Sequence, residues 1–260
     1  MIEFFTDAYN LLADNYQFLL RGVGYTMLIA LVGTVAGLLI GLATGVLRTC
    51  PLSKNGLVRF LQRILNAVIT VYVEVFRGTP MMVQAMVIYW GYAFATGGQT
   101  LPLIPSGILI VSINTGAYMA EIVRGGIMSI DNGQFEGAAA VGMTHWQTML
   151  HIILPQVLRN ILPSVANEFV INIKDTSVLN VIGVTELYYF ADVVKRQTFQ
   201  TFQTYLVVCI IYFILTFSVT RLLRLVEKKL QISDSFVICG SQSDPNAEIR
   251  VKKMPEVPHD

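Results

Sequence analysis

The feature that most constrains the fold is a set of long apolar segments that carry few charged residues. The clearest segment runs from about residue 25 to residue 47 and contains no Asp, Glu, Lys or Arg. Roughly 20 consecutive apolar residues are enough for a helix to cross a bilayer. Hydrophobic residues make up 54% of the chain and charged residues only 13%, which is too apolar for an ordinary soluble domain. The sequence therefore predicts an all-α, polytopic membrane helical bundle.

About five membrane spans are predicted, at residues 25–47, 57–95, 103–123, 162–184 and 205–219. The second stretch is too long for one simple span and is interrupted at Glu74-x-x-Arg77-Gly78-Thr79-Pro80. Loop 48–63 carries four basic residues and loop 97–105 carries no charge, so the two are expected on opposite sides. One broken span satisfies this condition and two spans do not. The N-terminus is then outside and the C-terminus inside.

The two ends of the chain differ from this membrane part in composition. Residues 1–22 mix aromatic and acidic side chains, lack the basic region of a signal peptide, and are expected to lie at the membrane interface. Residues 23–230 are expected to form the transmembrane domain. Residues 231–260 are rich in Ser, Pro and charge, which predicts a poorly ordered cytoplasmic tail. Residues 191–203 read as a polar external segment.

Four glycines recur at every fourth position of the first span: Gly33, Gly37, Gly41 and Gly45. On a helix this period places them in one stripe without side chains, which predicts close packing against another helix.

A polar-to-apolar stretch, Glu136–Pro155, lies between two predicted spans and reads EGAAAVGMTHWQTMLHIILP. Its alanines favour helix, and Gly142 is expected to end the turn. Thr144 can cap a second short helix in which Trp146, Met149, Leu150 and Ile153 recur at helical spacing. One interpretation is a knob that docks into a partner protein, and the alternative is an amphipathic helix on the bilayer surface.

The fourth span contains an unusual number of polar residues: Asn167, Glu168, Asn172, Lys174, Asp175, Thr176, Ser177 and Asn180. Glu168 and Asp175 are seven residues apart and therefore share a helix face. Ionisable groups at membrane depth predict a functional site that faces an aqueous cavity. The alternatives are that this stretch lies outside the bilayer or that Lys174 only neutralises Asp175. Glu74 and Arg77 are three residues apart and can pair on one face of the second span.

Two sets of residues resemble known transport proteins. Glu136, Ala138, Gly142, Ile152, Leu154 and Pro155 stand at the offsets of the EAA loop of ABC-transporter permeases, with Gly137 as a departure from its second alanine. Phe76–Pro80 resembles the F-R-G-T-P signature of polar amino-acid permeases. Asn167-Glu168, Lys174–Ser177 and Glu186-Leu187 resemble the N-E, K-D-T-S and E-L elements of the same proteins. The resemblance covers about residues 22–230.

This resemblance implies a type I ABC importer permease fold and a bacterial inner-membrane subunit that imports polar amino acids. It implies as partners two cytoplasmic ATPase subunits, an extracytoplasmic amino-acid-binding protein and a second permease, in a homodimer or heterodimer within the lipid bilayer. Residues expected to couple to the ATPase are Glu136, Gly137, Ala138, Gly142, Ile152, Leu154 and Pro155. Residues expected to line the substrate cavity are Glu168, Asp175, Lys174, Thr176, Asn114, Met82 and Gln84.

Two acids on one face favour a cationic substrate side chain, although an acid can also meet the α-amino group of any amino acid. An ion-coupled secondary transporter, with Glu168 and Asp175 as a relay, is the alternative function. A membrane-embedded enzyme is a third class, but the sequence offers no nucleophile–base pair for it.

Several other classes find no support in the sequence. The chain has no G-x-x-x-x-G-K-[ST] motif, so ATP and Mg²⁺ are expected on the partner ATPase and no cofactor in this chain. His145 and His151 are six residues apart, which is not metal-ligand spacing, and both are expected to be solvated. The three cysteines suggest no disulfide framework. A formal net charge of +1 gives no reason to expect nucleic-acid binding.

Overall fold

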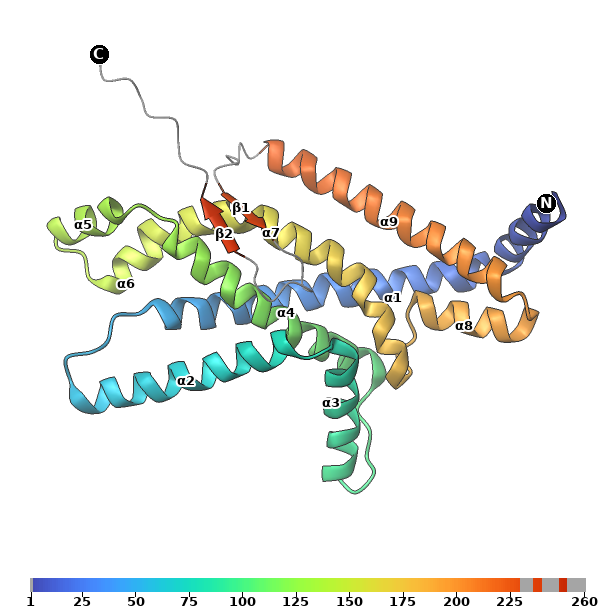
Figure 1. Cartoon of the computed structure of the whole chain (residues 1–260), viewed down its shortest axis with the longest axis horizontal. Coiled ribbons are helices and arrows are strands. Elements are labelled where there is room, and N and C mark those ends of the chain that lie inside the picture. The colour runs from blue at the N-terminus through green and yellow to red at the C-terminus, as the bar shows by residue number, and fades with distance from the viewer. Residues whose placement is uncertain (1, 230–235, 240–247, 252–260) are drawn as a thin grey trace, which may run out of the picture.

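The computed structural model describes residues 2–229, 236–239 and 248–251. Its helices, shown in Figure 1, are α1 (Ile2–Thr49), α2 (Gly56–Gly78), α3 (Met81–Ala95), α4 (Leu103–Met128), α5 (Asn132–Ala140), α6 (His145–Thr148), the π-helix η1 (Met149–Ile153), α7 (Leu154–Asp175), the 3₁₀-helix η2 (Thr176–Ile182), α8 (Leu187–Thr198) and α9 (Thr201–Lys229). Strands β1 (Phe236–Cys239) and β2 (Glu248–Val251) pair antiparallel, with Phe236 opposite Val251.

Five of the described helical segments are long and apolar enough to cross a membrane: Thr6–Thr49, Gly56–Gly78, Leu103–Met128, His145–Ile182 and Thr201–Lys229. This confirms the predicted all-α bundle of about five spans. The two short strands fall in the range 231–260, where a poorly ordered tail is expected, and most of that range lies outside the described residues.

The glycine stripe of α1 packs directly against α4, in the most extensive helix–helix contact of the described chain. The facing pairs are Gly33 with Val111, Gly37 with Thr115, Gly41 with Met119, and Gly45 with Val123. A Cβ atom placed on Gly41 would lie only 2.3 Å from Cβ of Met119, so the backbones approach too closely for any side chain. The predicted close packing is confirmed.

The same pairs show that α1 and α4 run parallel, because both residue numbers rise together. Parallel helices require an odd number of membrane crossings between them, and α2 supplies one. α3, at 15 residues, is shorter than a span and leaves α2 at a steep angle (Figure 1). The structure thus agrees with one crossing between residues 57 and 95. Pro80 ends the helix rather than bending it, because α2 stops at Gly78 and Thr79 is extended.

α1 begins well before the apolar segment, and residues 2–22 are not separated from the first span by any break. Ala8, Leu11 and Leu19 are buried in a cluster that includes Leu187 of α8 and Val207 of α9. The N-terminal part of α1 is therefore held by the last two helices of the chain.

The second half of the Glu136–Pro155 stretch is not a separate short helix, which corrects the prediction. Residues 145–182 form one continuous helical segment that includes the fourth span. Pro155 lies inside this continuous segment, directly after the π-helix η1, and such a local π adjustment accommodates the missing N–H of a proline. Just before it, η1 widens the helix, and the N–H of Leu154 donates to the carbonyl of Met149, five residues back.

Much of the predicted external segment 191–203 is also helical, as part of α8. This helix buries Leu187, Phe190 and Val194 along one side and places Lys195 and Arg196 in its last turn. It ends at Phe199, whose φ of +57° is left-handed.

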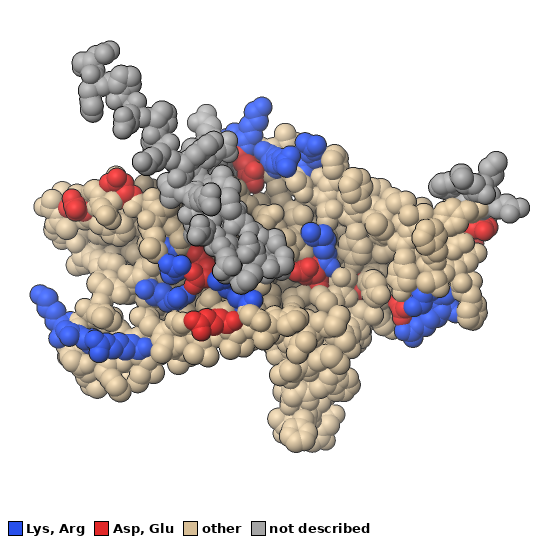
Figure 2. All heavy atoms as spheres, in the orientation of Figure 1, with Lys and Arg blue, Asp and Glu red and all other residues tan. Residues whose placement is uncertain are grey.

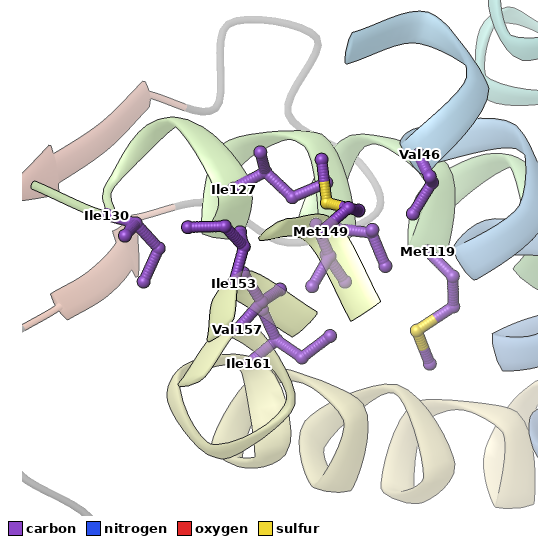
Figure 3. Close-up of a cluster of buried hydrophobic side chains, with 10 residues drawn as sticks. Val46, Met119, Ile127, Ile130, Met149, Ile153, Val157 and Ile161 are labelled. Carbon is purple, nitrogen blue, oxygen red and sulfur yellow. The ribbon is translucent and has the colours of Figure 1, made fainter. Parts of the chain in front are cut away.

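The core at one end of the bundle lies between α1, α4 and α7 (Figure 3). Met149, Ile153, Val157 and Ile161 follow one another at intervals of four residues and form one buried seam. They pack on residues of α4 such as Ile127, and on Val46 of α1. This core holds the second half of the Glu136–Pro155 stretch against α1 and α4.

Candidate functional site

The first half of the Glu136–Pro155 stretch forms an exposed helix with a defined end. Glu136 and Gly137 are exposed on α5, whereas Ala138 is buried. At its end, the N–H of Met143 donates to the Ala138 carbonyl at 3.0 Å, and the N–H of Gly142 to the Ala139 carbonyl at 3.0 Å. These two bonds form a Schellman motif, and Gly142 adopts its left-handed conformation, with φ +79°.

The second half starts with a capping box between Thr144 and Gln147, so Thr144 caps a helix as predicted. The helix does not present its apolar residues on one face. Met149 and Ile153 are buried, whereas Trp146 is 52% and Leu150 57% exposed. Exposed apolar side chains on an already well-packed helix are a feature of surfaces that contact another protein or the membrane.

Two of the three remaining predicted coupling residues anchor this surface to the core. Ile152 and Leu154 are partly buried against the α1–α4–α7 cluster, and Pro155 is exposed. The knob, formed by α5, α6 and η1, lies at one end of the molecule, beyond the last turns of α1 and α4 (Figure 1). Near it, Glu121 of α4 pairs with both Arg48 and Arg124, which ties the ends of α1 and α4 together.

The polar residues of the fourth span have different roles, and that of Asn172 is to connect three helices. Its side chain donates to Oγ1 of Thr34 at 2.8 Å and accepts from Oγ1 of Thr115 at 3.1 Å. All three residues are buried. Asn172 therefore fastens α7 to α1 and α4 at membrane depth, with its polar atoms satisfied.

Tyr118 of α4 lies within electrostatic reach of Arg77 of α2 and of Glu168 and Asp175 of α7. Glu168 is only 6% exposed. The charges of Arg77, Glu168 and Asp175 all act on the hydroxyl group of Tyr118. The guanidinium carbon of Arg77 lies 5.5 Å from the Tyr118 ring centroid, in a cation–π contact. One cation and two carboxyl groups therefore lie within electrostatic reach of one phenol.

The predicted Glu74–Arg77 pair is absent from the ion pairs of the described residues, so that prediction is wrong. Glu74 is exposed, whereas Arg77 is half-buried and turns toward Tyr118 of α4. Tyr118 was not among the predicted site residues. It lies four residues after Asn114 on the same face of α4, so extending that helix face by one turn finds it.

Gln84 and Asn114 do come together, but they stabilise the α2–α3 break. Nδ2 of Asn114 donates to Oε1 of Gln84 at 2.9 Å. Nε2 of Gln84 in turn donates to the carbonyls of Phe76 at 2.9 Å and Thr79 at 2.8 Å. The carbonyls that the end of α2 leaves without a helical partner are thus satisfied by a side chain of α3.

The other three predicted cavity residues lie elsewhere. Lys174 lines a groove of about 250 Å³ between α7 and α9, beside Phe217 and Arg221. Thr176 is fully buried and donates to the Ile173 carbonyl at 3.0 Å. Met82 is 45% exposed on α3. The predicted set of seven residues is therefore not one cluster.

Neither histidine of the Glu136–Pro155 stretch belongs to a cluster of three or more His, Cys, Asp or Glu residues, since the described part of the chain holds no such cluster. His151 is exposed, with Nδ1 3.0 Å from the carbonyl of Gln147. His145 is not fully solvated, which corrects the prediction: it is half-buried, and its Nε2 is buried without a hydrogen-bond partner among the described residues.

α8 carries an ion cluster at the opposite end from the knob. Asp192 pairs with both Lys195 and Arg196, one turn further along the helix. The hydrogen bond from Lys195, and that from Arg196, hold the pKa of the Asp192 carboxyl below its usual value. Figure 2 shows the resulting basic patch over α8, and a separate one over the start of α2.

Comparison with known proteins gives consistent matches. The family described as "Binding-protein-dependent transport system inner membrane component" matches residues 37–232. The glutamine transport system permease protein GlnP of Escherichia coli K12 is 36% identical over 214 residues, which cover 82% of this chain and 93% of GlnP. The probable glutamine ABC transporter permease protein GlnM of Bacillus subtilis 168 is 32% identical over 227 residues, which cover 86% of this chain and 98% of GlnM.

Solved structures agree. The chain resembles a crystal structure described as an amino acid ABC transporter with histidines, at 32% identity and a TM-score of 0.71, covering 84% of this chain and 96% of that one. An inward-facing MetNI methionine ABC transporter shares the fold, at 20% identity and a TM-score of 0.61, covering 81% of this chain and 97% of that one.

Proposed function

This chain belongs to the family of binding-protein-dependent transport system inner membrane components, and we propose that, as the permease subunit of an amino-acid ABC importer, it carries a polar amino acid, with glutamine as the first candidate. Two relatives, each matched over more than nine-tenths of its own length, are named as glutamine permeases. Glu168 and Asp175 then bind the α-ammonium group that every amino acid carries.

The observation that carries the proposal is the carboxyl group of Glu168, which is buried inside the helical bundle within electrostatic reach of Tyr118. Ionisable groups at this depth are expensive to bury and are the expected lining of a substrate path. A second candidate is a substrate with a cationic side chain, favoured by the presence of two acids on one face of α7. The relatives' names give no support to that candidate, and competition among amino acids decides between the two.

In this proposal the knob formed by α5, α6 and η1 docks into a partner ATPase, where ATP and Mg²⁺ bind. Its exposed Glu136, Trp146 and Leu150 offer contacts, and Ile152 and Leu154 link it to the core. Movement of the ATPases pulls the knobs of two permeases and biases the spans between two states. An extracytoplasmic binding protein delivers the substrate at the other end, and the second permease is identical or homologous.

Reconstitution with the ATPase and binding protein tests this function. The wild type is expected to co-purify with the ATPase and to show ATPase activity stimulated by the binding protein with glutamine. A Glu136→Ala/Gly142→Asp variant is expected to lose the ATPase. Stimulation by arginine or lysine but not by glutamine would establish the cationic substrate instead.

The ion-coupled secondary transporter remains the competing function. It expects amino-acid uptake by the purified chain alone, driven by an ion gradient and unaffected by changes in the knob. Uptake of that kind in liposomes without ATPase would overturn the ABC mechanism for this chain.

A further inference from the structure

α2 carries an apolar surface that no described part of the chain covers. Toward the bundle, Ile69 and Val73 are buried against Ala120 of α4. On another side of the helix, six apolar side chains recur at alternating intervals of four and three residues, and each is between 47% and 69% exposed: Leu57, Leu61, Ile64, Val68, Val71 and Val75. This spacing places the six side chains in one stripe along an α-helix, which we call the outer stripe.

The length of the outer stripe matches the interior of a bilayer. At about 1.5 Å per residue, the distance from Leu57 to Val75 is about 27 Å. The hydrocarbon core of a bilayer is about 30 Å thick. Because α2 is one of the described segments that can cross a membrane, this exposed stripe suits contact with the acyl chains of lipids.

Unbalanced positive charge lies at the N-terminal end of the same stripe. Lys54, Arg59 and Arg63 are exposed, and none of them forms an ion pair among the described residues. Between Asp14 and Glu74 the sequence contains no acidic residue. Figure 2 shows the resulting basic patch over the start of α2. The α1–α2 corner, residues 50–63, therefore presents cations next to an apolar surface.

Hydrogen bonds fix the shape of this corner and the direction of its cations. The N–H of Ser53 donates to Oε1 of Gln62 at 2.7 Å, and the N–H of Leu57 donates to Oδ1 of Asn55 at 3.1 Å. Nε of Arg59 donates to the Ser53 carbonyl at 2.9 Å, so the Arg59 side chain reaches back past the start of α2. Helical side chains favour this direction, which turns Arg63, one turn further along, toward the same end.

We propose that the α1–α2 corner binds an anionic phospholipid, with the headgroup between Lys54, Arg59 and Arg63 and the acyl chains along the outer stripe. This inference goes beyond amino-acid transport and does not depend on which substrate is carried. Anionic headgroups attract basic residues that lie beside a membrane span, and a guanidinium can hold a phosphate through two parallel hydrogen bonds. A zwitterionic lipid can cover the stripe equally well, but its headgroup carries a compensating positive charge.

The test compares a phosphatidylglycerol with a phosphatidylcholine that has the same acyl chains, so that only headgroup charge differs. The permease–ATPase complex in detergent is mixed with equal amounts of both, and the lipids bound to the intact complex are counted by native mass spectrometry. The wild type is expected to prefer phosphatidylglycerol by about fivefold for each basic residue that contacts it. The Lys54→Gln/Arg59→Gln/Arg63→Gln variant is expected to lose this preference.

The matched control removes three basic residues from the end of α9, in the variant Arg221→Gln/Arg224→Gln/Lys228→Gln. The net charge of the chain changes by the same amount, but here the basic residues stand beside an acid, Glu227. This control is expected to keep the preference for phosphatidylglycerol. If it loses the preference to the same extent, binding follows net charge and the assignment to the α1–α2 corner is wrong.

Other outcomes also overturn the proposal. A wild type that retains both lipids equally has no headgroup site, and displacement of phosphatidylglycerol by inorganic phosphate, at an ionic strength matched with chloride, would show a site for a soluble anion. A triple variant that keeps the lipid preference but separates from the second permease would assign the corner to contact between permeases. If the triple variant does not assemble, Arg63→Gln decides, because an unchanged lipid preference in that variant contradicts the proposal and an about fivefold lower one supports it.

Discussion

At the scale of single residues, two glycines of the Glu136–Pro155 stretch show that backbone conformation, rather than lack of space for a side chain, can require glycine. A Cβ added to Gly137 or to Gly142 would meet no atom within 4 Å, so neither position excludes a side chain by contact. Only Gly142 has a positive φ, +79°, where an L-residue is strained. The need for glycine at Gly142 is thus a need of the turn between α5 and α6.

We therefore expect Gly142→Ala to destabilise this turn by about 1–2 kcal/mol and to weaken co-purification with the ATPase. Gly137→Ala is the control, and it is expected to leave assembly intact while stabilising α5 by roughly 0.5–1 kcal/mol. Pull-down of the ATPase at increasing salt measures how well each purified variant assembles. Equal behaviour of the two variants would show that the Schellman turn does not set the shape of the knob.

At the scale of helices, the contact between α1 and α4 carries the most specific steric demand. Gly41→Val is expected to disrupt it, because a Cβ already lies 2.3 Å from Met119 and overpacking costs about 1–3 kcal/mol even when neighbours adjust. The expected result is a lower midpoint of thermal unfolding in detergent and a reduced folded yield. Gly24→Ala on the same helix, where a Cβ meets no atom within 4 Å, is expected to behave as wild type. A Gly41→Val variant as stable as the wild type would contradict the close packing of α1 on α4.

α8 carries a titrating side chain, Asp192, outside the spans. Because the pKa of Asp192 is lowered in the folded state, its carboxylate stabilises the fold above the unfolded pKa of about 3.9. That contribution is lost as pH falls through the lowered folded pKa. The protection of α8 amides against hydrogen exchange, relative to the intrinsic rate at each pH, is expected to fall on acidification below about pH 4 in the wild type. Asp192→Asn is expected to exchange faster already at neutral pH and to lose most of this pH dependence.

These helices also show what the sequence can and cannot predict. The glycine stripe was predictable because four residues at a fixed period define a helix face without knowledge of the partner. α8 was missed because its buried residues, such as Leu187 and Val194, are interleaved with charges and follow the left-handed Gly183, a combination that resembles a loop.

Contacts between distant segments were the least predictable part of the candidate site. Glu168 and Asp175 were found because ionisable groups in an apolar span stand out. The bond of Asn114 to Gln84 joins α4 to α3 across 30 residues, and nothing local to either residue indicates that it satisfies a helix end. The rotation of Arg77 toward Tyr118 rather than Glu74 likewise depends on where α4 lies.

At the scale of the whole molecule, the distribution of charge explains an apparent exception to the positive-inside rule. Lys195 and Arg196 lie at the end that this rule assigns to the outside, but both pair with Asp192, so the cluster has one net positive charge. At the opposite end, the stretch 48–63 and the end of α9 carry Arg48, Lys54, Arg59, Arg63, Arg221, Arg224, Lys228 and Lys229. The excess of basic residues at that end, which also carries the knob, favours it as the cytoplasmic end.

Labelling with a membrane-impermeant maleimide tests this orientation in a variant whose three cysteines, Cys50, Cys209 and Cys239, are replaced by serine. Phe199→Cys, at a position that is 88% exposed between α8 and α9, is expected to react in intact cells. Gly137→Cys in the knob is expected to react only after the membrane is permeabilised, because α4 and α7 place it at the other end of the spans. Both reactions follow from one orientation, since the two sites are separated by the single crossing of α7. Labelling of Gly137→Cys in intact cells, with Phe199→Cys protected, would show that the orientation is the reverse of the one inferred. The knob would then lie where no cytoplasmic ATPase can reach it.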